Sequence, residues 1–387
     1  MTGDRRVVVL GVTADVSLSL MRGFPEYLSA HGWKVHVVSS TGPRLTELGT
    51  SGEVTTHALK MAREPAPFAD ASSLVSWVRL LRRIRPDVVM VGTPKAGLLG
   101  LVAAVLTRVP VRVYHVRGLR LETTRGLARR VYTLLERIAF ATSTTAIAVS
   151  SSLRDRLIDL RLAQGDQVVV LGRGSSNGVD TKRFRPADPS ALRDAGAERA
   201  RIGLAGVPTV GFVGRLTRDK GLEVLAEACK RLADDGVDHQ LLVIGDVEEA
   251  ESRLVLDQLG AGGYPPVVLG HVPDTAPYYA LMDVLCLPTF REGFPNVVLE
   301  ASASGVPVVT TDATGAVDSV VDDVTGSIAR VGDPVSLAAE LARLLTNPER
   351  AKAMGQAGRE LVVASYARDV VWMQTESFLR NLRARRA

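Results

Sequence analysis

The sequence predicts an α/β protein with two domains, each built on a parallel β-sheet that helices cover on both faces. The chain has 387 residues, which is too long for one ordinary hydrophobic core at roughly 100 to 200 residues per domain. Short runs rich in Val and Ile alternate with segments of helical periodicity, as in βαβ units. A stretch dense in Gly, Ser and Asn, residues 172–186, divides this alternation into two series and is typical of an inter-domain linker.

The predicted strands form one series before the linker and another after it. The first series is expected at Arg6–Gly11, Val35–Ser39, Val88–Val91, Val111–His115 and Ala146–Ser150. The second is expected at Thr209–Gly214, Gln240–Gly245, Val267–Leu269, Val284–Pro288 and Val306–Thr310. We therefore expect an N-terminal domain at residues 1–175, a C-terminal domain at 176–368 and a final helical segment at 369–387 that returns to the first domain.

Several helices and the start of the chain follow from the same patterns. The longest strongly apolar stretch, Ala96–Thr107, falls short of the roughly 20 residues that span a bilayer, so a buried helix is expected. A short helix is expected within Ala187–Gly206, and the last helix, Val370–Arg383, has apolar residues at helical spacing. Arg5 and Arg6 pass directly into a β-rich run, so no export signal is expected.

Two cysteines, Cys229 and Cys286, lie in apolar surroundings. Their spacing fits neither a zinc site nor a disulfide framework, which predicts buried free thiols. A cytoplasmic location fits this use of cysteine.

The charge is distributed unevenly along the chain. Residues 1–180 hold 24 Lys and Arg against 14 Asp and Glu, whereas the remainder holds 23 against 28. The basic first half suggests an anionic partner: a phosphate-bearing acceptor, an anionic membrane surface or nucleic acid. Ordinary surface arginines are the alternative.

Two cations follow a predicted strand of the second domain. Strand Thr209–Gly214 runs directly into Arg215, and Lys220 and Gly221 stand at the next turn. Unpaired N–H groups and helix dipoles favour anions at the carboxyl ends of parallel strands. Arg215 and Lys220 can therefore bracket a diphosphate and neutralise charge that develops on it as a leaving group. Two solvated loop cations are the alternative.

A pair of glutamates flanks a predicted helix start in the same domain. The segment from Glu292 to Glu300 reads EGFPNVVLE and follows strand Val284–Pro288. Pro295 suits the opening of a helix, which leaves the amides of residues 296–298 available to a phosphate or to sugar hydroxyls. A carboxylate accepts two hydrogen bonds from vicinal hydroxyls, so one glutamate can reach a sugar and the other a ribose. A helix-dipole carboxylate and an exposed one are the alternative.

Together, the segments GRLTRDKG and EGFPNVVLEASASGVPVV resemble the donor site of the family-4 glycosyltransferases of the GT-B fold. The resemblance extends to NGVDTKRFRP at the linker, to LGHVPDTAPYYALMDVLCLP and to AVDSVVDDVTG. It implies two Rossmann-like domains that face each other across a cleft. It also implies a retaining transfer from a nucleotide sugar that needs no metal or other cofactor, with UDP as the commonest donor nucleotide.

The resemblance also assigns roles to single residues. The matches of Arg215 and Lys220 bind the donor diphosphate. The match of Glu292 contacts the transferred sugar, and that of Glu300 holds the ribose hydroxyls. The loop Gly270–Val272 contacts the base, mostly through its backbone. The donor set implied is Gly214, Arg215, Lys220, Gly270, His271, Val272, Glu292, Gly293, Phe294, Pro295, Asn296, Val297, Val298 and Glu300.

The implied reaction is a front-face substitution in which the leaving phosphate oxygen helps to deprotonate the acceptor. A histidine at the end of strand Val111–His115 matches one that often faces the donor sugar in the family, so His115 is expected to bond a sugar hydroxyl. A core or capping histidine is the alternative. With Arg215, Lys220 and Glu292, His115 completes the expected catalytic set.

The first domain normally supplies acceptor specificity in this family. Its segments RPDVVMVGTPKAGLLG and YHVRGLRLETTRGLARR resemble the bacterial subgroup that extends lipid-linked saccharides, of the polyprenyl phosphate type, in cell-surface glycan assembly. The segment Gly126–Phe140 is amphipathic, and core packing is favoured for it over peripheral contact with the inner face of the cell membrane. The acceptor contacts expected are Thr13, Lys95, Arg117 and Arg120.

Other function classes fit the sequence less well. A small-molecule acceptor remains the alternative within the family. A dinucleotide-dependent oxidoreductase needs Gly-x-Gly-x-x-Gly after a strand, which neither domain completes. Nucleic-acid binding lacks the aromatic platforms that accompany basic residues in such proteins. A catalytically silent nucleotide-sugar-binding partner protein would not be expected to keep Arg215, Lys220, Glu292 and Glu300 together.

Overall fold

The computed structural model describes residues 6–62, 66–122, 124–247, 255 and 264–384. The chain divides into two compact units. Unit 1 comprises Met1–Asn177 with Asp369–Ala387, and unit 2 comprises Gly178–Arg368. Each unit is an α/β structure with its own parallel sheet.

Unit 1 contains a seven-stranded parallel sheet with the order β3-β2-β1-β4-β5-β6-β7. The order reverses between β1 and β4, and at such a switch point the loops after neighbouring strands separate and leave room for a ligand. The strands are β1 (Val7–Gly11), β2 (Lys34–Ser39), β3 (Thr55–Ala58), β4 (Val88–Val91), β5 (Val111–Val116), β6 (Thr145–Ala148) and β7 (Val168–Val169).

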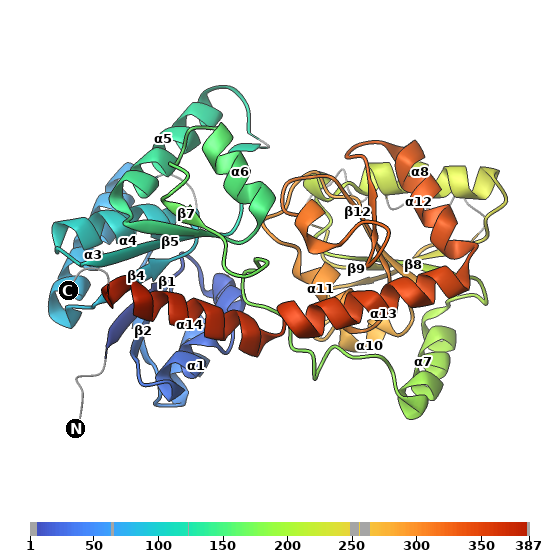
Figure 1. Cartoon of the computed structure of the whole chain (residues 1–387), viewed down its shortest axis with the longest axis horizontal. Coiled ribbons are helices and arrows are strands. Elements are labelled where there is room, and N and C mark those ends of the chain that lie inside the picture. The colour runs from blue at the N-terminus through green and yellow to red at the C-terminus, as the bar shows by residue number, and fades with distance from the viewer. Residues whose placement is uncertain (1–5, 63–65, 123, 248–254, 256–263, 385–387) are drawn as a thin grey trace. The chain divides into compact units, whose positions relative to one another are not determined.

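Helices cover both faces of this sheet, with α3, α4 and α5 on one face and α1 and α14 on the other (Figure 1). The apolar stretch identified in the sequence forms α4, most of whose residues are buried, as predicted. The helical elements are η1 (Asp15–Met21), α1 (Phe24–Ala30), α2 (Pro43–Thr50), α3 (Pro67–Ile84), α4 (Pro94–Leu106), η2 (Arg120–Glu122), α5 (Gly126–Thr142), α6 (Ser151–Asp159) and α14 (Arg368–Ala384).

The C-terminal helix α14 packs on unit 1, as its apolar spacing predicts. Leu379 is buried in the same core as the side chains of β1 and β2. The indole of Trp33 donates a hydrogen bond to Glu376 at 3.0 Å, and that of Trp372 donates to Asn177 at 2.8 Å. The two bonds satisfy the indole N–H groups of the buried Trp33 and the partly buried Trp372, so neither ring packs with an unpaired donor.

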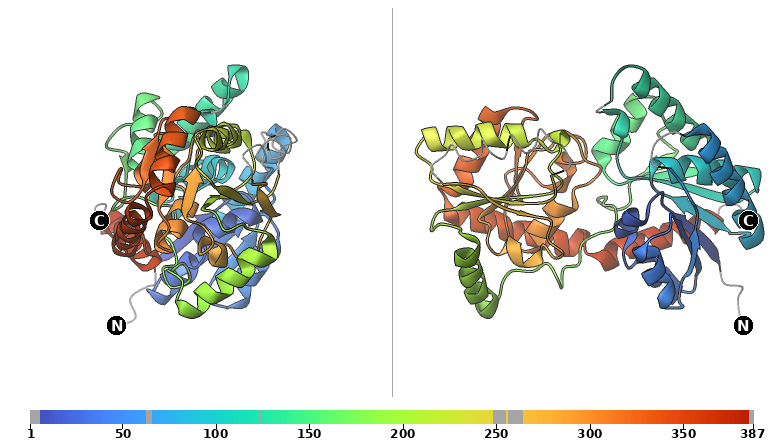
Figure 2. Two further views of the ribbon diagram at one scale, coloured as in Figure 1. Left: turned by 90° about the vertical axis from the view of Figure 1, so that its right-hand side faces the viewer. Right: turned by 180° about the vertical axis from the view of Figure 1, so that it is seen from behind.

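Unit 2 contains a six-stranded parallel sheet with the order β10-β9-β8-β11-β12-β13. On one of its faces α8 and α12 lie side by side, and α11 packs with α13 (Figures 1 and 2). The strands are β8 (Thr209–Val213), β9 (Gln240–Ile244), β10 (Val267–Gly270), β11 (Val284–Leu287), β12 (Val308–Thr311) and β13 (Ser327–Ala329). The helices are α7 (Pro189–Ile202), η3 (Arg218–Lys220), α8 (Leu222–Asp234), α10 (Ala276–Tyr279), α11 (Asn296–Ala303), η5 (Val317–Ser319), α12 (Pro334–Leu345) and α13 (Pro348–Ser365).

Several predicted element ends are wrong by a few residues, and three strands were missed. The predicted strand Ala146–Ser150 ends at Ala148 because the Ser150 hydroxyl caps α6, accepting a hydrogen bond from the amide of Leu153 at 3.3 Å. The missed strands β3, β7 and β13 are only two to four residues long; β3 and β13 lack an apolar run, and β7 takes up two residues of the short run Val168–Leu171. No helix in the described ranges is both long and apolar enough to cross a membrane.

A buried glutamate in unit 1 makes its stability depend on pH. Burial raises the pKa of Glu136 to about 7, although the hydroxyl of Tyr114, at 2.9 Å, stabilises the carboxylate. Such a group stabilises the folded state below its ordinary pKa of 4.5, and that contribution is lost as the pH rises through about 7.

Replacing Glu136 by glutamine is therefore expected to raise Tm relative to the wild type by roughly 2–6 °C at pH 8 and by much less at pH 5. Thermal unfolding followed by circular dichroism at both pH values measures this difference. Glu53→Gln, at an exposed position of the same unit, is the control. An equal change in Tm at both pH values would contradict a buried ionisable group as the cause.

Candidate functional site

The candidate site of unit 2 begins where β8 and β9 end. The amide of Gly214 donates to the carbonyl of Ile244 at 2.9 Å, and the amide of Gly245 donates to that of Gly270, also at 2.9 Å. A Cβ at Gly245 would lie 1.8 Å from the carbonyl oxygen of Gly214. Only glycine permits this approach, so the carboxyl ends of β8, β9 and β10 meet closely at one edge of the sheet.

The loop after β8 turns sharply into helix α8. Gly221 has φ of +74°, and a Cβ there would lie 1.9 Å from the carbonyl oxygen of Pro288. This contact brings the loop Arg215–Gly221 against the loop that follows β11. The two segments singled out in the sequence therefore meet in space.

Two ion pairs join these loops. Lys220 forms an ion pair with Glu292, and both side chains are largely buried. Arg291 Nη2 lies 3.1 Å from Asp219 Oδ2. Charged partners in so small a space give the loops a fixed geometry, because the hydrogen bonds of an ion pair are directional.

Neutral hydrogen bonds add to this connection. The carbonyl of Asp219 accepts from the amide of Phe290 at 2.9 Å and from the hydroxyl of Thr289 at 3.0 Å. The amide of Glu292 donates to the carbonyl of Thr314 at 2.8 Å. These hydrogen bonds hold the backbone of the second loop close to the strand ends.

A glycine behind the second loop fixes how closely it packs. Gly315 has φ of +76°, and a Cβ at this position would lie 2.4 Å from the carbonyl oxygen of Gly293 and 2.5 Å from that of Glu292. A larger residue there would displace the loop that carries Glu292. The segment AVDSVVDDVTG begins directly after this glycine.

Asp219 remains ionised in this setting. Burial alone would raise its pKa, but the hydroxyl of Thr217, at 2.5 Å, and the charges of Arg291, Lys220 and Arg215 hold the pKa below the usual range. Arg215 is exposed on the same loop. The loop Arg215–Gly221 thus carries one carboxylate, Asp219, and three cations, Arg215, Arg218 and Lys220, an excess of positive charge suited to an anionic ligand.

Helix α11 opens where Pro295 predicts, with Asn296 as its first residue. Gly293, Phe294 and Pro295 are buried, and Phe294 packs against Tyr366 with ring centroids 5.3 Å apart. The amide of Val298, expected to be available to a ligand, donates instead to the carbonyl of Pro295 at 3.2 Å. This tight first turn corrects the prediction for that amide.

Glu300 lies on α11 and faces a tyrosine from α10. Its Oε2 accepts from the hydroxyl of Tyr279 at 2.8 Å, and the hydroxyl of Thr275 lies 3.5 Å away. Burial of the carboxyl raises the pKa of Glu300 to about 7, although Tyr279 stabilises the charged form. The carboxylate is thus held in place and is poised to change its charge near neutral pH.

The loop Gly270–Val272 extends the same edge of the sheet beyond β10. Gly270 has φ of +66° and is joined to β9 through Gly245. His271 is exposed, with Nδ1 3.6 Å from a carboxylate oxygen of Asp246. The loop therefore lies beside the ends of β9 and β10, and Lys220 and Glu292 belong to the ends of β8 and β11.

In unit 1 the expected residues also lie after strand ends. The hydroxyls of Thr13 and Thr93 are 2.8 Å apart, and the Thr13 hydroxyl accepts from the amide of Ala96 at 3.1 Å. Thr13 thus caps the first turn of α4. Its hydroxyl already has protein partners on both sides.

Lys95 and Arg120 differ in their surroundings. Lys95 is buried, and Nζ lies 2.6 and 2.7 Å from the carboxylate oxygens of Asp70. Arg120 is exposed and its guanidinium stands over the ring of Tyr132 at 5.3 Å. The charge of Lys95 is therefore largely neutralised within the protein.

Arg117 and His115 lie together at the end of β5. One guanidinium nitrogen of Arg117 is 3.3 Å from His115 Nδ1, and Nε and Nη1 are buried with no hydrogen-bond partner among the described residues. Burial lowers the pKa of Arg117 to about 10, so it keeps its charge at neutral pH. Burial and Arg117 lower the pKa of His115 well below its usual range, so this histidine is neutral.

A buried guanidinium with unpaired N–H groups is costly unless an anion satisfies it. Gly92 packs against this strand end: a Cβ there would lie 3.1 Å from the carbonyl oxygen of His115, a tight contact, and 3.4 Å from the guanidinium carbon of Arg117. The end of β5 is therefore shaped to hold Arg117 inside unit 1, and its charge points to an anionic ligand.

Some residues of the site were missed in the sequence. Asp219 and Arg291 join the two loops, and Tyr279 positions Glu300. All three stand inside or next to the segments that carry the resemblance. Their position was therefore visible, but the pairings depend on which loops meet in space. Among the described residues, no group of three or more His, Cys, Asp or Glu is arranged to hold a metal ion.

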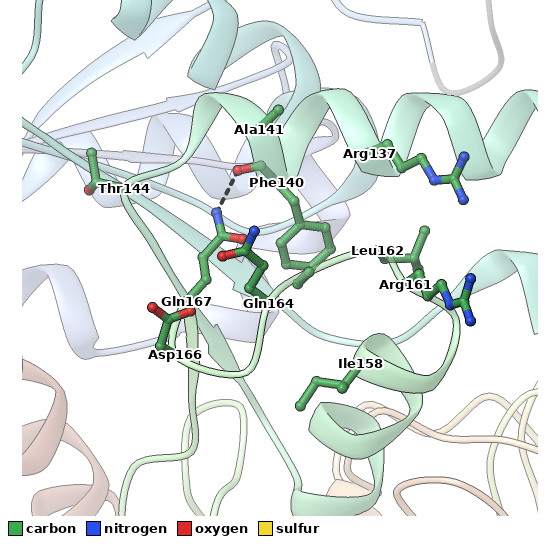
Figure 3. A pocket seen from close by; sticks show the side chains of 11 residues that line it. Arg137, Phe140, Ala141, Thr144, Ile158, Arg161, Leu162, Gln164, Asp166 and Gln167 are labelled. Atoms are coloured by element: carbon green, nitrogen blue, oxygen red, sulfur yellow. Dashed lines mark hydrogen bonds between the residues drawn. The ribbon is translucent and has the colours of Figure 1, made fainter.

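A separate cavity of about 740 Å³ lies in unit 1 at the amino ends of β6 and β7 (Figure 3). The side chain of Gln167 donates to the carbonyl of Phe140 at 2.7 Å across it. This is the opposite edge of the sheet from His115 and Arg117, so the cavity is not part of the candidate site. It is lined by Arg137, Phe140, Ala141, Thr144, Ile158, Arg161, Leu162, Ala163, Gln164, Asp166 and Gln167.

Two protein-family models match the chain. The model described as glycosyl transferases group 1 matches residues 207–347. The glycosyl transferase 4-like domain matches residues 21–174. The first match contains Lys220, Glu292 and Glu300, and the second contains Lys95 and Arg117.

The chain is 39% identical to the capsular polysaccharide biosynthesis glycosyltransferase CapM of Staphylococcus aureus, over 95% of this chain and 94% of that protein. It is 27% identical to the UDP-Gal:alpha-D-GlcNAc-diphosphoundecaprenol alpha-1,3-galactosyltransferase of Escherichia coli, over 73% of each. The structure is similar to that of HepE from Anabaena in complex with UDP, with a TM-score of 0.78, 19% identity and coverage of 97% of this chain and 100% of that one.

Proposed function

The chain belongs to the family-4 glycosyltransferases of the GT-B fold, and on this premise we propose that it is a retaining enzyme that moves a hexose or an aminosugar from UDP to a lipid-linked saccharide. Its similarity to a capsular polysaccharide enzyme fits a role in cell-surface glycan assembly. The observation that carries the proposal is the meeting of Lys220 and Glu292, from two loops at neighbouring strand ends. A cation and a carboxylate side by side match a diphosphate and the sugar bonded to it.

In the proposed donor complex, Lys220 and Arg215 bind the diphosphate. The bond between the anomeric carbon and the phosphate oxygen breaks, and the electron pair stays on that oxygen. Lys220 and Arg215 stabilise the resulting charge. The acceptor hydroxyl attacks from the same face and loses its proton to the leaving phosphate oxygen. Glu292 bonds hydroxyls of the transferred sugar.

Glu300 is proposed to hold the ribose hydroxyls, and the loop Gly270–Val272 to contact the base. UDP is favoured over GDP because the name of the E. coli relative specifies UDP-Gal and HepE was solved with UDP. Other relatives, from Mycobacterium tuberculosis, are named as GDP-mannose-dependent. The test of the donor must therefore include both nucleotides.

For the acceptor, the buried guanidinium of Arg117 supports a phosphate-bearing group. The E. coli relative is named for a diphosphoundecaprenol-linked acceptor, which has the same chemistry. Phosphate oxygens accept hydrogen bonds from the guanidinium Nε and Nη1, for which the protein offers no acceptor in the described part of the chain.

The test of this function is the release of nucleoside diphosphate from a panel of UDP- and GDP-sugars, with membrane-lipid extract and with soluble sugars as acceptors. We expect nucleoside diphosphate to be released from a UDP-sugar only when the lipid fraction is present. Release that needs only a soluble sugar would move the assignment to small-molecule glycosylation. No release with any donor would indicate a catalytically silent partner protein.

Replacing Arg117 by glutamine is expected to lower kcat/KM for the acceptor by roughly 10- to 100-fold, because charge-assisted hydrogen bonds to phosphate are lost. Arg120→Gln should have a smaller effect, because that side chain is exposed over Tyr132. Steady-state kinetics with the acceptor varied measure both, and Tm shows whether the variants fold.

Binding of free UDP, measured by calorimetry, should be unchanged in the Arg117 and Arg120 variants. Arg82→Gln, an exposed change near the end of α3, is the matched control. Weakened UDP binding in the Arg117 variant would contradict an acceptor role for this residue.

A further inference from the structure

The first two turns of helix α5 make little contact with the rest of unit 1. All residues from Gly126 to Val131 are exposed, and the buried residues of the helix, Glu136, Ala139 and Phe140, lie in its second half. A helix that projects with so little buried surface normally rests on something else, since helices in proteins are stabilised mostly by packing.

The exposed face of α5 carries a continuous apolar stripe. Leu127, Val131, Leu134 and Ile138 are 76%, 39%, 58% and 36% exposed. Their spacing of four, three and four residues places them on one side of the helix, and the buried Ala139 and Phe140 point away from it. The expectation that the apolar residues of this helix pack in the core is therefore wrong for this stripe.

Two basic side chains, Arg130 and Arg137, flank the stripe on one side. A shallow groove of about 480 Å³ along the helix is lined by Gly126, Arg129, Arg130, Thr133, Leu134 and Arg137. The sequence has no Asp or Glu between Glu122 and Glu136, so no carboxylate along the exposed turns offsets these arginines. At the other end of the helix, Figure 3 shows Arg137 and Arg161 extending in the same direction at one side of the neighbouring cavity.

An apolar stripe alone would suit a protein partner or a second copy of the chain. Apolar side chains with guanidinium groups beside them suit the surface of an anionic bilayer, where leucine enters the acyl boundary and arginine meets the phosphates. The basic excess of the first half of the chain agrees with this. We propose that α5 is a membrane-docking helix that lies in the interface of an anionic bilayer, with Leu127, Val131, Leu134 and Ile138 facing the lipid.

Helix α5 follows two of the candidate acceptor residues closely in the sequence. It follows Arg117 and Arg120, which come directly after β5, and its first turn lies on the side of the sheet where the strands have their carboxyl ends. A bilayer beneath α5 would therefore lie on the side of unit 1 that holds Arg117. The proposal does not rest on the proposed acceptor, because binding to lipid is measured without substrate.

The test is co-sedimentation of the full chain with vesicles of phosphatidylglycerol and phosphatidylcholine in equal amounts, or of phosphatidylcholine alone. The wild type should bind the anionic vesicles, and binding should weaken as salt is raised. Leu127→Ser with Leu134→Ser should weaken binding roughly 10-fold or more, through lost apolar burial. Arg130→Gln with Arg137→Gln should remove most of the preference for anionic vesicles, with about a 10-fold loss.

Val335→Ser with Met373→Ser is the matched control, because these residues are similarly exposed but lie on α12 and α14. It should bind vesicles as the wild type does, and all variants should keep the wild-type Tm. Equal binding by the Leu127 and Leu134 variant would overturn the proposal. Failure of the wild type to bind vesicles would overturn it as well. A dimer in analytical ultracentrifugation that the Leu127 and Leu134 variant dissociates would overturn it and assign the stripe to a protein interface.

Discussion

Replacing Lys220 by alanine is expected to lower kcat/KM for the donor by about 100-fold or more. In the proposed mechanism the ammonium stabilises charge that grows on the diphosphate as the sugar departs, and losing one such contact costs about 100- to 1,000-fold in other enzymes. The variant also leaves the Glu292 carboxylate without its cation in a largely buried place. Steady-state kinetics with the donor varied measure the loss.

Glu292→Ala should reduce turnover by a similar factor, and the double variant should lose much less than the product of the two. When two residues act as one unit, the effects of replacing each of them on turnover do not multiply in the double variant. Arg218→Ala is the matched control, because this cation lies on the same turn with its side chain mostly exposed. Near-normal rates for both Lys220→Ala and Glu292→Ala would remove the donor site from this edge of the sheet.

Replacing Glu300 by alanine is expected to lower kcat/KM for the donor by roughly 100-fold, mainly through a higher KM. Two charge-assisted hydrogen bonds to ribose hydroxyls would be lost, each typically about 1.5–3 kcal/mol. Donor kinetics and calorimetric binding of UDP measure the effect. Glu223→Ala, an exposed glutamate on α8, is the control.

The same glutamate predicts a pH dependence. With a pKa of about 7 in the protein without donor, Glu300 becomes protonated as the pH falls below neutral. A protonated carboxyl accepts fewer hydrogen bonds, so the KM for the donor should rise between pH 8 and pH 6. Glu300→Gln should bind donor weakly and should lose this pH dependence. An unchanged pH profile in Glu300→Gln would show that another group titrates.

The fold could be predicted from the sequence because its signals are local. Runs such as Val88–Val91 carry enough apolar side chains to identify a strand buried on both faces, and the linker at 172–186 is marked by its composition. The strand β3, with the sequence TTHA at the edge of the sheet, lacks such a signal, since only a strand buried on both faces must be apolar throughout. The ends of the strands depend on caps such as Ser150, which a strand pattern does not contain.

The sequence could predict those features of the candidate site that depend on a single segment, but not those that depend on contacts between segments. Lys220 and Glu292 stand in motifs that follow strands, so their place at the sheet edge follows from topology. Their ion pair depends on Gly221, which lets the first loop reach Pro288, and such contacts are set by packing between distant segments. The ion pair of Lys95 with Asp70 could not be predicted for the same reason, because Asp70 lies on another helix.

The ion pair of Lys220 with Glu292 also bears on how the enzyme ends its cycle. In the proposed mechanism the diphosphate product first carries the acceptor's proton, and once this proton passes to water the product has more negative charge than it had in the donor. A bare ammonium would then hold it tightly. Glu292 is an alternative anion for the same ammonium, so departure of the product exchanges one counter-ion for another. The carboxylate that orients the sugar at the start would thus speed recovery of the free enzyme and limit inhibition by the nucleotide that accumulates.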